Sequence, residues 1–416
     1  MNTRLTKDSQ GILLLTSSMG LPRDNNELRP LSFSEWNSLA EKLANSSLER
    51  PSAFFQSEPK EWKKILNLND ALVDRMQRLL ARGAAMSMEI ERLNSLGIWI
   101  TTRAESTYPS RLKKILKRKS PLFLFGAGDY RLASGGVAIV GSRDVDQEGS
   151  VFTANLAKRC VAEGLTIVSG GARGVDTIAQ DTALTHGGNA VSILSNGLEQ
   201  AIRKKDTRNN ILDNRFLLLS PFHPKVPFRA YNAMDRNKYV YALAHYAVVI
   251  SATEKKGGTW AGAIENLKSK WVPLYVRSDI SCPQGNQALV NEGGIPLNEK
   301  VFSQNVSIKD WFDRNKNSEV GGNDLATTNT HSIWVNVQED FDLFPIVLPY
   351  LCNALQAAKN TQELAKLLHV EDSQVGLWLE RAHKEGMVSM LEGQGNYKSN
   401  LDRENSDLVH EQISFF

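Results

Sequence analysis

Six short apolar runs, separated by longer amphipathic segments, occupy the stretch between residues 137 and 276. The runs are residues 137–140, 165–169, 190–194, 216–219, 247–250 and 272–276. Strands that are apolar throughout are typical of a parallel sheet with both faces covered, and the segments between the runs have the apolar spacing of helices. The pattern therefore predicts a doubly wound, Rossmann-like α/β domain over residues 131–312.

Four further regions flank this domain. Residues 1–130 repeat apolar residues at helical spacing and end in a basic stretch, which predicts a helical domain with a basic connector. Residues 313–332 are rich in Asn, Ser, Gly and Thr and predict a linker. Residues 333–400 give three helical patterns and then a hairpin pattern, the order of a winged-helix module. Residues 401–416 are mostly polar and predict a flexible tail.

Composition and charge restrict the possible classes of protein. The chain is 41% hydrophobic and 23% charged, has no apolar run long enough to span a membrane and has no CxxC pair, which predicts a soluble, cytoplasmic protein. Residues 331–416 hold 13 acidic and 6 basic residues, whereas the whole chain has a net charge of +3. Residues 111–120 hold six basic residues, and residues 201–240 hold nine against three acidic ones. Such clusters attract polyanions, and the alternative is a solvated surface without a partner, so charge alone does not decide between them.

Glycine-rich loops follow the first two predicted strands. The first loop contains Ser142 and Arg143, and the second contains Gly170, Gly171 and Arg173. Ligands of open parallel sheets bind at the carboxyl ends of the strands, where loop amides and arginine can hold phosphate. Tight turns without a ligand are the alternative for each loop. Neither loop matches GxGxxG, so the sequence predicts no nicotinamide cofactor, and no other cofactor is indicated.

Two later segments add positive charge beside aromatic or hydroxyl groups. Residues 224–238 interleave basic residues with Phe228 and Tyr231, which suits a strand of nucleic acid, with cations on phosphates and aromatic rings under bases. The loop after the fifth strand combines two lysines, two glycines and a threonine at a helix start. The nucleic-acid contacts predicted from these segments are Lys225, Arg229, Arg236, Lys238, Lys255, Lys256 and Thr259.

Signals for catalysis are poor. The seven histidines show no metal-ligand spacing, and Ser142 lacks the GxSxG elbow of a hydrolase. Asp176, which follows the second glycine loop, has two possible roles, a catalytic base or a residue that orders the loop. We therefore expect a binding protein without a metal site and without enzymatic activity.

Several motifs together resemble the DprA/Smf family of DNA-processing proteins. They include the Tyr108-Pro109 dipeptide, the segment 121–126, "AIVGSR" ending at Arg143, the loop 169–176 and "NQALVNEGG" at 286–294. Arg236, Asn237 and Lys238 stand at the position of the family's RNR motif, which adds Asn237 to the predicted nucleic-acid contacts. The resemblance covers residues 96–296. Pro221, Lys238 and Ser251 depart from the family pattern.

The resemblance implies single-stranded DNA binding by the Rossmann-like domain and assembly as a homodimer. It also implies protection of the strand and help in loading a RecA-type recombinase. The setting would be transformation, recombination or defence against foreign DNA. Arg143, Arg236, Lys238 and Lys255 are the residues that the family's motifs carry over as DNA contacts.

Two other classes compete with this interpretation. LOG-like nucleotide hydrolases of the same superfamily have a "PGGxGTxxE" loop similar to residues 257–259, but this chain has Gly262 at the position of the glutamate, and Glu265 lies elsewhere on the helix. A winged-helix transcription regulator fits less well because the C-terminal module is acidic, and an acidic surface repels phosphates.

The last five residues suggest a separate contact. They resemble the bacterial sliding-clamp-binding motif, with a polar anchor and three apolar residues, and the alternative is a tail that folds back on its own chain. The predicted partner-binding residues are Gln412, Ile413, Phe415 and Phe416.

Overall fold

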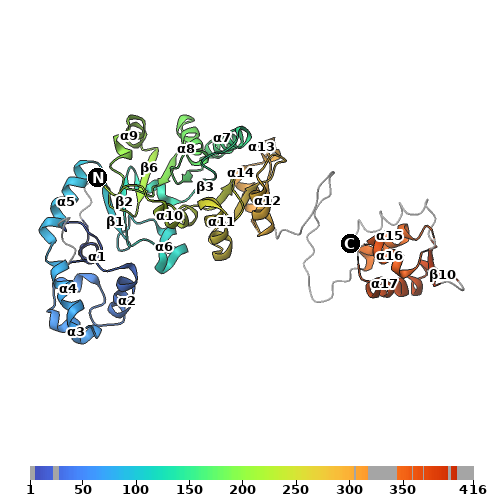
Figure 1. Cartoon of the computed structure of the whole chain (residues 1–416), viewed down its shortest axis with the longest axis horizontal. Coiled ribbons are helices and arrows are strands. Elements are labelled where there is room, and N and C mark those ends of the chain that lie inside the picture. Colours follow the sequence, from blue (N-terminus) through green and yellow to red (C-terminus); the bar gives the residue numbers. More distant parts are fainter. Residues whose placement is uncertain are drawn as a thin grey trace. The chain divides into compact units, whose positions relative to one another are not determined.

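The computed structural model describes residues 5–21, 28–303, 306–316, 344–357, 359–368, 370–391 and 395–400. The chain divides into two compact units, Met1–Asp324 and Leu325–Phe416 (Figure 1). The predicted linker 313–332 lies at this division, but helix α14 (Ile308–Asn315) includes its first three residues. The predicted clamp-binding residues Gln412, Ile413, Phe415 and Phe416 lie outside the described residues.

A mixed sheet forms the centre of the first unit. Within the described residues it has nine strands in the order β1-β2-β6-β5-β4-β3-β7-β8-β9. Strands β3 to β9 are parallel, whereas β2 is antiparallel to both β1 and β6. The strands are β1 (Trp99–Thr102), β2 (Phe123–Ala127), β3 (Val137–Val140), β4 (Ile167–Ser169), β5 (Ala190–Ile193), β6 (Phe216–Ser220), β7 (Tyr246–Val249), β8 (Leu274–Arg277) and β9 (Ile295–Leu297).

The six apolar runs form β3 to β8, so the predicted doubly wound sheet is confirmed. Their side chains are buried on both faces: Ala138 belongs to one hydrophobic cluster, and Val137 and Ile139 belong to the other. The predicted boundary near residue 131 does not separate two structural domains, because β1 and β2 extend the same sheet. β1 ends in Thr101 and Thr102, whose burial an apolar pattern does not reveal.

Helices cover both faces of the sheet. The clusters place α6, α10, α11 and α12 on one face and α7, α8, α13 and α14 on the other. Their bounds are α6 (Ser110–Leu116), α7 (Gln147–Ala162), α8 (Val175–Thr185), α10 (Ala230–Leu243), α11 (Gly257–Ser269), α12 (Gln284–Asn291) and α13 (Lys300–Ser303). This double cover buries both sides of the parallel strands and leaves their carboxyl ends for loops.

The N-terminal helices pack on one another and on the β1–β2 end of the sheet. Trp36 and Met76 are buried in a cluster of these helices, and Leu13 and Leu93 contribute to a second cluster that includes Phe125 of β2. Ser32 begins its helix with a capping box that satisfies two backbone N–H groups. These helices are α1 (Lys7–Thr16), α2 (Phe33–Ala44), α3 (Pro59–Leu66), α4 (Asp70–Leu80) and α5 (Gly83–Ser95), and α9 (Lys205–Leu212) joins the second cluster through Ile211.

The second unit is a small helical body with a hairpin. α15 (Phe344–Ala354), α16 (Thr361–Leu368) and α17 (Asp372–Lys384) precede the antiparallel pair β10 (Val388–Leu391) and β11 (Asn396–Ser399). Its core holds Leu351, Leu364 and Leu379. The assignment of this unit to the winged-helix class stays a prediction. None of the described helices in either unit combines the length and the apolar content that crossing a membrane requires.

Candidate nucleic-acid interface

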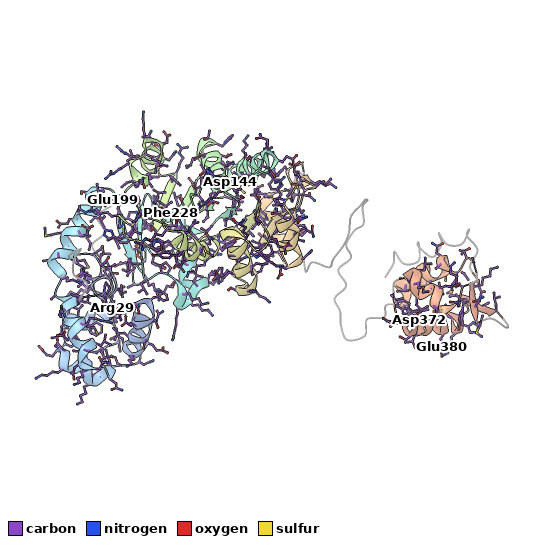
Figure 2. All side chains as sticks on the ribbon, viewed as in Figure 1. Arg29, Asp144, Glu199, Phe228, Asp372 and Glu380 are labelled. Atoms are coloured by element: carbon purple, nitrogen blue, oxygen red, sulfur yellow. The ribbon has the colours of Figure 1, made fainter. Side chains whose placement is uncertain are left out.

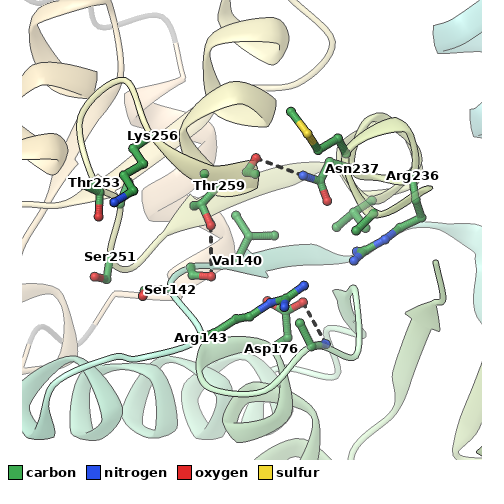
Figure 3. A pocket seen from close by; sticks show the side chains of 18 of the residues that line it. Val140, Ser142, Arg143, Asp176, Arg236, Asn237, Ser251, Thr253, Lys256 and Thr259 are labelled. Carbon is green, nitrogen blue, oxygen red and sulfur yellow. Dashed lines mark hydrogen bonds between the residues drawn. The ribbon is translucent and has the colours of Figure 1, made fainter. Parts of the chain in front are cut away.

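The loops after β3 and β7 face each other across a crevice. The two strands are neighbours, but the chain leaves β3 for β4 on one side and returns to β7 on the other. Such a change of direction opens a crevice at the carboxyl ends of the strands. A pocket of about 540 Å³ lies there, bounded by the two loops, by α10 and by the first turn of α11 (Figure 3).

Arg236 of α10 forms part of the pocket wall and has no hydrogen-bond partner among the described residues. The residue is only 5% exposed. Its Nε has no hydrogen-bond partner, and no hydrogen bond or ion pair joins Arg236 to another described residue. Burial lowers the pKa of the guanidinium, and the negative charge of Asp176 opposes this shift. Because buried polar groups are normally hydrogen-bonded, the guanidinium is suited to an acceptor that a ligand brings.

Asp176 orders the glycine loop from inside. Its Oδ2 accepts the backbone N–H groups of Gly170 at 3.1 Å and Ala172 at 3.3 Å, so two amides that the sequence predicted for an anion are already occupied. Burial raises the pKa of Asp176, and the charge of Arg236 opposes the shift. A Cβ atom at Gly170 would lie 1.7 Å from Nη1 of Arg236, so the guanidinium packs directly against the loop backbone.

Hydrogen bonds between segments hold the pocket walls together. The Thr259 hydroxyl donates to the carbonyl of Gly141 at 3.0 Å, and Nδ2 of Asn237 donates to the carbonyl of Gly258 at 2.9 Å (Figure 3). Gly174 has a φ of 84°, and a Cβ atom there would lie 2.4 Å from the carbonyl oxygen of Ser142. Thr259 and Asn237 therefore position the walls, and glycine lets the first two loops touch.

Cationic and exposed apolar side chains line the rim of the pocket. Cζ of Arg143 lies 5.4 Å from the ring centroid of Phe228, which is 51% exposed (Figure 2 labels Phe228). Tyr231, in the first turn of α10, and Met234, about one turn into the helix, are 62% and 57% exposed. Arg143 is exposed as well. Three neighbouring exposed apolar residues beside a cation form a surface suited to stacking with bases and contact with phosphates.

A second pocket adjoins the first. It has a volume of about 310 Å³ and lies at the loops that follow β4 and β5. Both pockets are lined by Arg143, Ala172, Phe228 and Arg236, so these residues stand where the two hollows meet. The two pockets together form a path across the carboxyl ends of β7, β3, β4 and β5.

The structure brings most of the predicted contacts to these two pockets. Ser142, Arg143, Arg236, Asn237, Lys256 and Thr259 line the first, and Gly170, Gly171, Arg173, Arg143 and Arg236 line the second. Arg173 is exposed and forms an ion pair with Asp144.

Four predicted contacts do not line either pocket. Lys238 forms an ion pair with Asp235 and lies 5.2 Å from the ring centroid of Tyr239, and Lys255 pairs with Glu254 at 3.1 Å. The remaining two are exposed residues near the start of α10, namely Lys225 and Arg229. Lys238 points away from Arg236 because two residues along a helix rotate the side chain by about 200°.

Tyr241 is a pocket residue that the sequence pattern did not indicate. It is 1% exposed, lines the first pocket, and its hydroxyl has no hydrogen-bond partner. A Cβ atom at Gly262 would lie 3.1 Å from Cε2 of Tyr241, so the tyrosine ring packs against the backbone of α11 at this glycine. A tyrosine inside a helical apolar pattern is usually part of the core, and only its position beside the pocket distinguishes it.

The two pockets and their rim can bind an elongated anion that also carries exposed apolar groups, such as unstacked rings. Arg143 and Lys256 supply exposed positive charge, and the start of α11 adds the positive end of a helix dipole. No cluster of His, Cys, Asp and Glu that could hold a metal ion occurs in the described part of the chain.

Comparisons with known proteins give consistent matches. The family model described as DNA recombination-mediator protein A matches residues 99–303. Protein Smf of Escherichia coli is 31% identical over 152 residues, which are 36% of this chain and 40% of Smf. DNA processing protein DprA of Bacillus subtilis is 25% identical over 214 residues, which are 48% of this chain and 71% of that protein. The X-ray structure of DprA from Streptococcus pneumoniae shares the fold, with a TM-score of 0.50 and 21% identity over 64% of this chain and 95% of that chain.

Proposed function

Because this chain belongs to the DprA/Smf family of DNA-processing proteins, we propose that it binds single-stranded DNA across the two pockets at the carboxyl ends of β7, β3, β4 and β5. The observation that carries the proposal is Arg236, a guanidinium that is 5% exposed and has no partner among the described residues. A buried donor such as this Nε that lacks a hydrogen bond costs about 1–3 kcal/mol, which an acceptor group of a bound strand would offset.

The distribution of charge around the pockets supports a nucleic acid as the ligand. Arg143, Lys256 and the start of α11 lie at the rim, where phosphates of a strand would meet them. Arg236 lies deeper and would meet an acceptor of a nucleotide that enters the pocket. The residues at the rim thus supply affinity for DNA that depends on the salt concentration. Arg236 supplies a contact that forms only when a nucleotide enters the pocket.

The exposed apolar residues favour a single strand over a duplex. Phe228, Tyr231 and Met234 offer surfaces on which unstacked bases can lie. In a duplex the faces of the bases are covered by their neighbours, so these side chains would gain little. A nucleotide can enter the pocket beside Arg236 only if its base is unpaired.

Turnover of a nucleotide is not part of the proposal. The LOG-like alternative needs a glutamate on the helix after the glycine loop, and Gly262 stands at that position. The ring of Tyr241 fills the space beside Gly262. The protein would therefore bind a strand without cutting it, as a cytoplasmic recombination mediator.

The proposal of protein partners is based on family membership. The family model carries the description "DNA recombination-mediator protein A". We therefore propose that the protein protects single strands and helps to load a RecA-type recombinase, and that it works as a homodimer. DNA processing in transformation is the setting that fits best.

A fluorescence titration at two salt concentrations tests the proposal. A labelled single strand should bind more tightly than a duplex of the same length. Arg143→Ala should reduce the salt dependence of the single-strand affinity by roughly 0.7 in log–log slope, since one phosphate contact is lost. Lys268→Ala, an exposed lysine at the far end of α11, should leave the slope unchanged and serves as the matched control. Equal affinities for both forms of DNA, or equal slopes in all three proteins, would contradict the proposal.

A further inference from the structure

A basic segment between α6 and β2 lies outside both pockets. Residues 111–120 hold six basic residues. They include most of α6 and the 3-10 turn η2 (Lys117–Lys119), which leads into β2. Four lysines of this segment are exposed, and we refer to them together as the η2 platform: Lys113, Lys114, Lys117 and Lys119.

The pairing of β2 puts η2 at the same edge of the sheet as the two pockets. β2 is antiparallel to β6, and its Phe125 pairs with Ser220, the last residue of β6. The chain therefore enters β2 at the edge where the parallel strands end. Only β6 separates β2 from β5, whose loop lines the second pocket. Neighbouring strands lie about 4.8 Å apart, so β2 is roughly 10 Å from β5, a distance that a stacked DNA strand covers in about three nucleotides.

The helix that carries the first two platform lysines lies beside α10 (Figure 1). Nε of Arg111, at the start of α6, donates to the carbonyl of Leu243, the last residue of α10, at 3.1 Å. Leu116 and Val240 belong to the same hydrophobic cluster. Since α6 starts where α10 ends, the two helices run in opposite directions. The end of α6 thus lies toward the first turns of α10, which form the rim of the first pocket.

The platform lysines have no carboxylate partner. No hydrogen bond or ion pair joins the side chains of Lys114, Lys117 or Lys119 to another described residue. Nζ of Lys113 donates to the carbonyl of Arg103 at 3.1 Å. Positive charges gathered on one surface repel each other, and a bound polyanion relieves this repulsion.

Arg103 holds the backbone of the platform in place. Its guanidinium donates to the carbonyl groups of Arg118 at 2.9 Å and Pro121 at 3.3 Å, and also to that of Ser120. Lys117 has a φ of 50°, in the left-handed region that favours glycine. The backbone alone therefore does not favour a lysine at this position.

An exposed aromatic ring accompanies the lysines, as at the rim of the pockets. Cζ of Arg103 lies 5.4 Å from the ring centroid of Phe33, which is 41% exposed. Arg143 and Phe228 at the rim are separated by the same distance. Exposed cations beside an exposed ring suit the phosphates and the unstacked bases of a single strand.

We propose that the η2 platform binds phosphates of the same DNA strand where it continues past the second pocket. This inference rests on the proposed single-strand binding and extends it beyond the pockets. A strand that ends within the pockets does not reach the lysines. The contribution of the platform therefore depends on the length of the strand, and since it comes from phosphates it does not depend on the base sequence.

The test compares salt-dependent titrations of the full chain with two oligothymidylates, one of about 6 nucleotides that fills the pockets and one of about 20 that extends past them. A variant that combines Lys114→Gln, Lys117→Gln and Lys119→Gln should bind the short strand nearly as the unchanged protein does. For the long strand its log–log salt slope should be smaller by about 2, because each phosphate contact of a single strand contributes roughly 0.7. The matched control removes three exposed lysines of α3, α7 and α11 by combining Lys64→Gln, Lys158→Gln and Lys268→Gln, and it should keep both slopes.

A single variant separates the charge from the fold. Lys117→Gly removes one platform charge and suits the left-handed backbone, so it should melt no lower than the unchanged protein and should still reduce the long-strand slope by roughly 0.7. An unchanged long-strand slope in the platform variants, equal losses for both strand lengths, or an equal loss in the control would overturn the inference but not the proposed function. Failure of the unchanged protein to bind either strand would overturn both.

Discussion

Arg82 and Arg236 are both buried arginines, but they differ in their hydrogen bonds. Arg82, 9% exposed, donates to the carbonyls of Leu79 at 3.0 Å, Met19 at 2.8 Å and Ser17 at 3.2 Å, and also to that of Leu14. Arg236, 5% exposed, has no hydrogen-bond partner among the described residues.

The difference separates a structural group from a binding group. Leu14 and Ser17 lie at the end of α1, where carbonyl groups lack helical partners and carry partial negative charge. Arg82 satisfies them and so joins α1 to the start of α5. Arg236 lies beside the pocket and leaves its donors for a ligand. Substitutions at the two sites should therefore affect different properties.

The largest effect is expected for Arg82→Met. Removal of the guanidinium leaves several buried carbonyl groups without a donor, so the free energy of unfolding should fall by about 3–5 kcal/mol. Chemical denaturation measures this change. The affinity of the folded protein for a single strand should stay the same, and a large loss of affinity at full folding would show that the comparison is wrong.

Arg236→Met should have the reverse profile. No hydrogen bond within the described protein is lost, only the attraction between the guanidinium and Asp176, so stability should fall much less than in Arg82→Met, whereas single-strand affinity should fall by about 2 kcal/mol, or roughly thirtyfold. Anisotropy titration measures the affinity. Lys238→Met is the control on the same helix, since Lys238 pairs with Asp235 outside the pockets and its loss should change affinity little. Similar losses in both variants would mean that positive charge alone decides binding.

Gly170→Ala should weaken binding less than Arg236→Met does. The three nearest atoms to the added methyl group all belong to the Arg236 guanidinium, at 1.7 to 2.4 Å, so that side chain must move. A displaced but charged arginine keeps part of its attraction for the strand, and we expect an affinity loss of roughly threefold to tenfold. The same titration detects it, and an unchanged affinity would indicate that the position of Arg236 is not critical.

The smallest expected effect is a pH dependence of stability that arises from His245, which belongs to neither arginine site. Its Nδ1 accepts the N–H of Gly136 at 3.1 Å, and burial, together with the charge of Arg111, lowers its pKa. The unfolded chain therefore binds the proton more tightly, so stability is complete above about pH 6.5 and decreases as the pH falls through that value. Melting temperatures between pH 7.5 and 5 should show a small decrease that His245→Gln reduces. His223, whose pKa burial also lowers, would account for a remaining slope.

Much of the sheet and of the site can be predicted from the sequence because both follow short-range patterns. The apolar runs of β3 to β8 mark buried strands, and residues that follow them, such as Arg143 and Gly170, must lie at one edge of a parallel sheet. β1 is different. Its Thr102 is buried against Ser9, which lies 93 residues away and forms a hydrogen bond of 2.7 Å with it. A pattern within the strand does not reveal such a partner.

The different roles of nearby residues on α10 could not be predicted from the sequence either. Arg236 and Lys238 are two residues apart and look equivalent in a basic segment, yet only the first lines the pocket. Which of the two residues faces the pocket depends on how α10 is rotated about its own axis, and tertiary packing fixes that rotation. The place of Tyr241 depends in turn on the close approach of α10 to α11 at Gly262.

Thermal unfolding of the unchanged protein and of Arg236→Met, each alone, with a single strand and with a duplex, tests the central claim most directly. A ligand that binds only the folded state raises the melting temperature. The account predicts that the single strand raises the melting temperature of the unchanged protein more than the duplex does. Arg236→Met should melt only slightly lower on its own, because it loses the attraction to Asp176 but no hydrogen bond, and should gain little from the strand. A variant that melts lower without DNA but gains as much from the strand would show that Arg236 serves the fold, as Arg82 does, and would contradict the account.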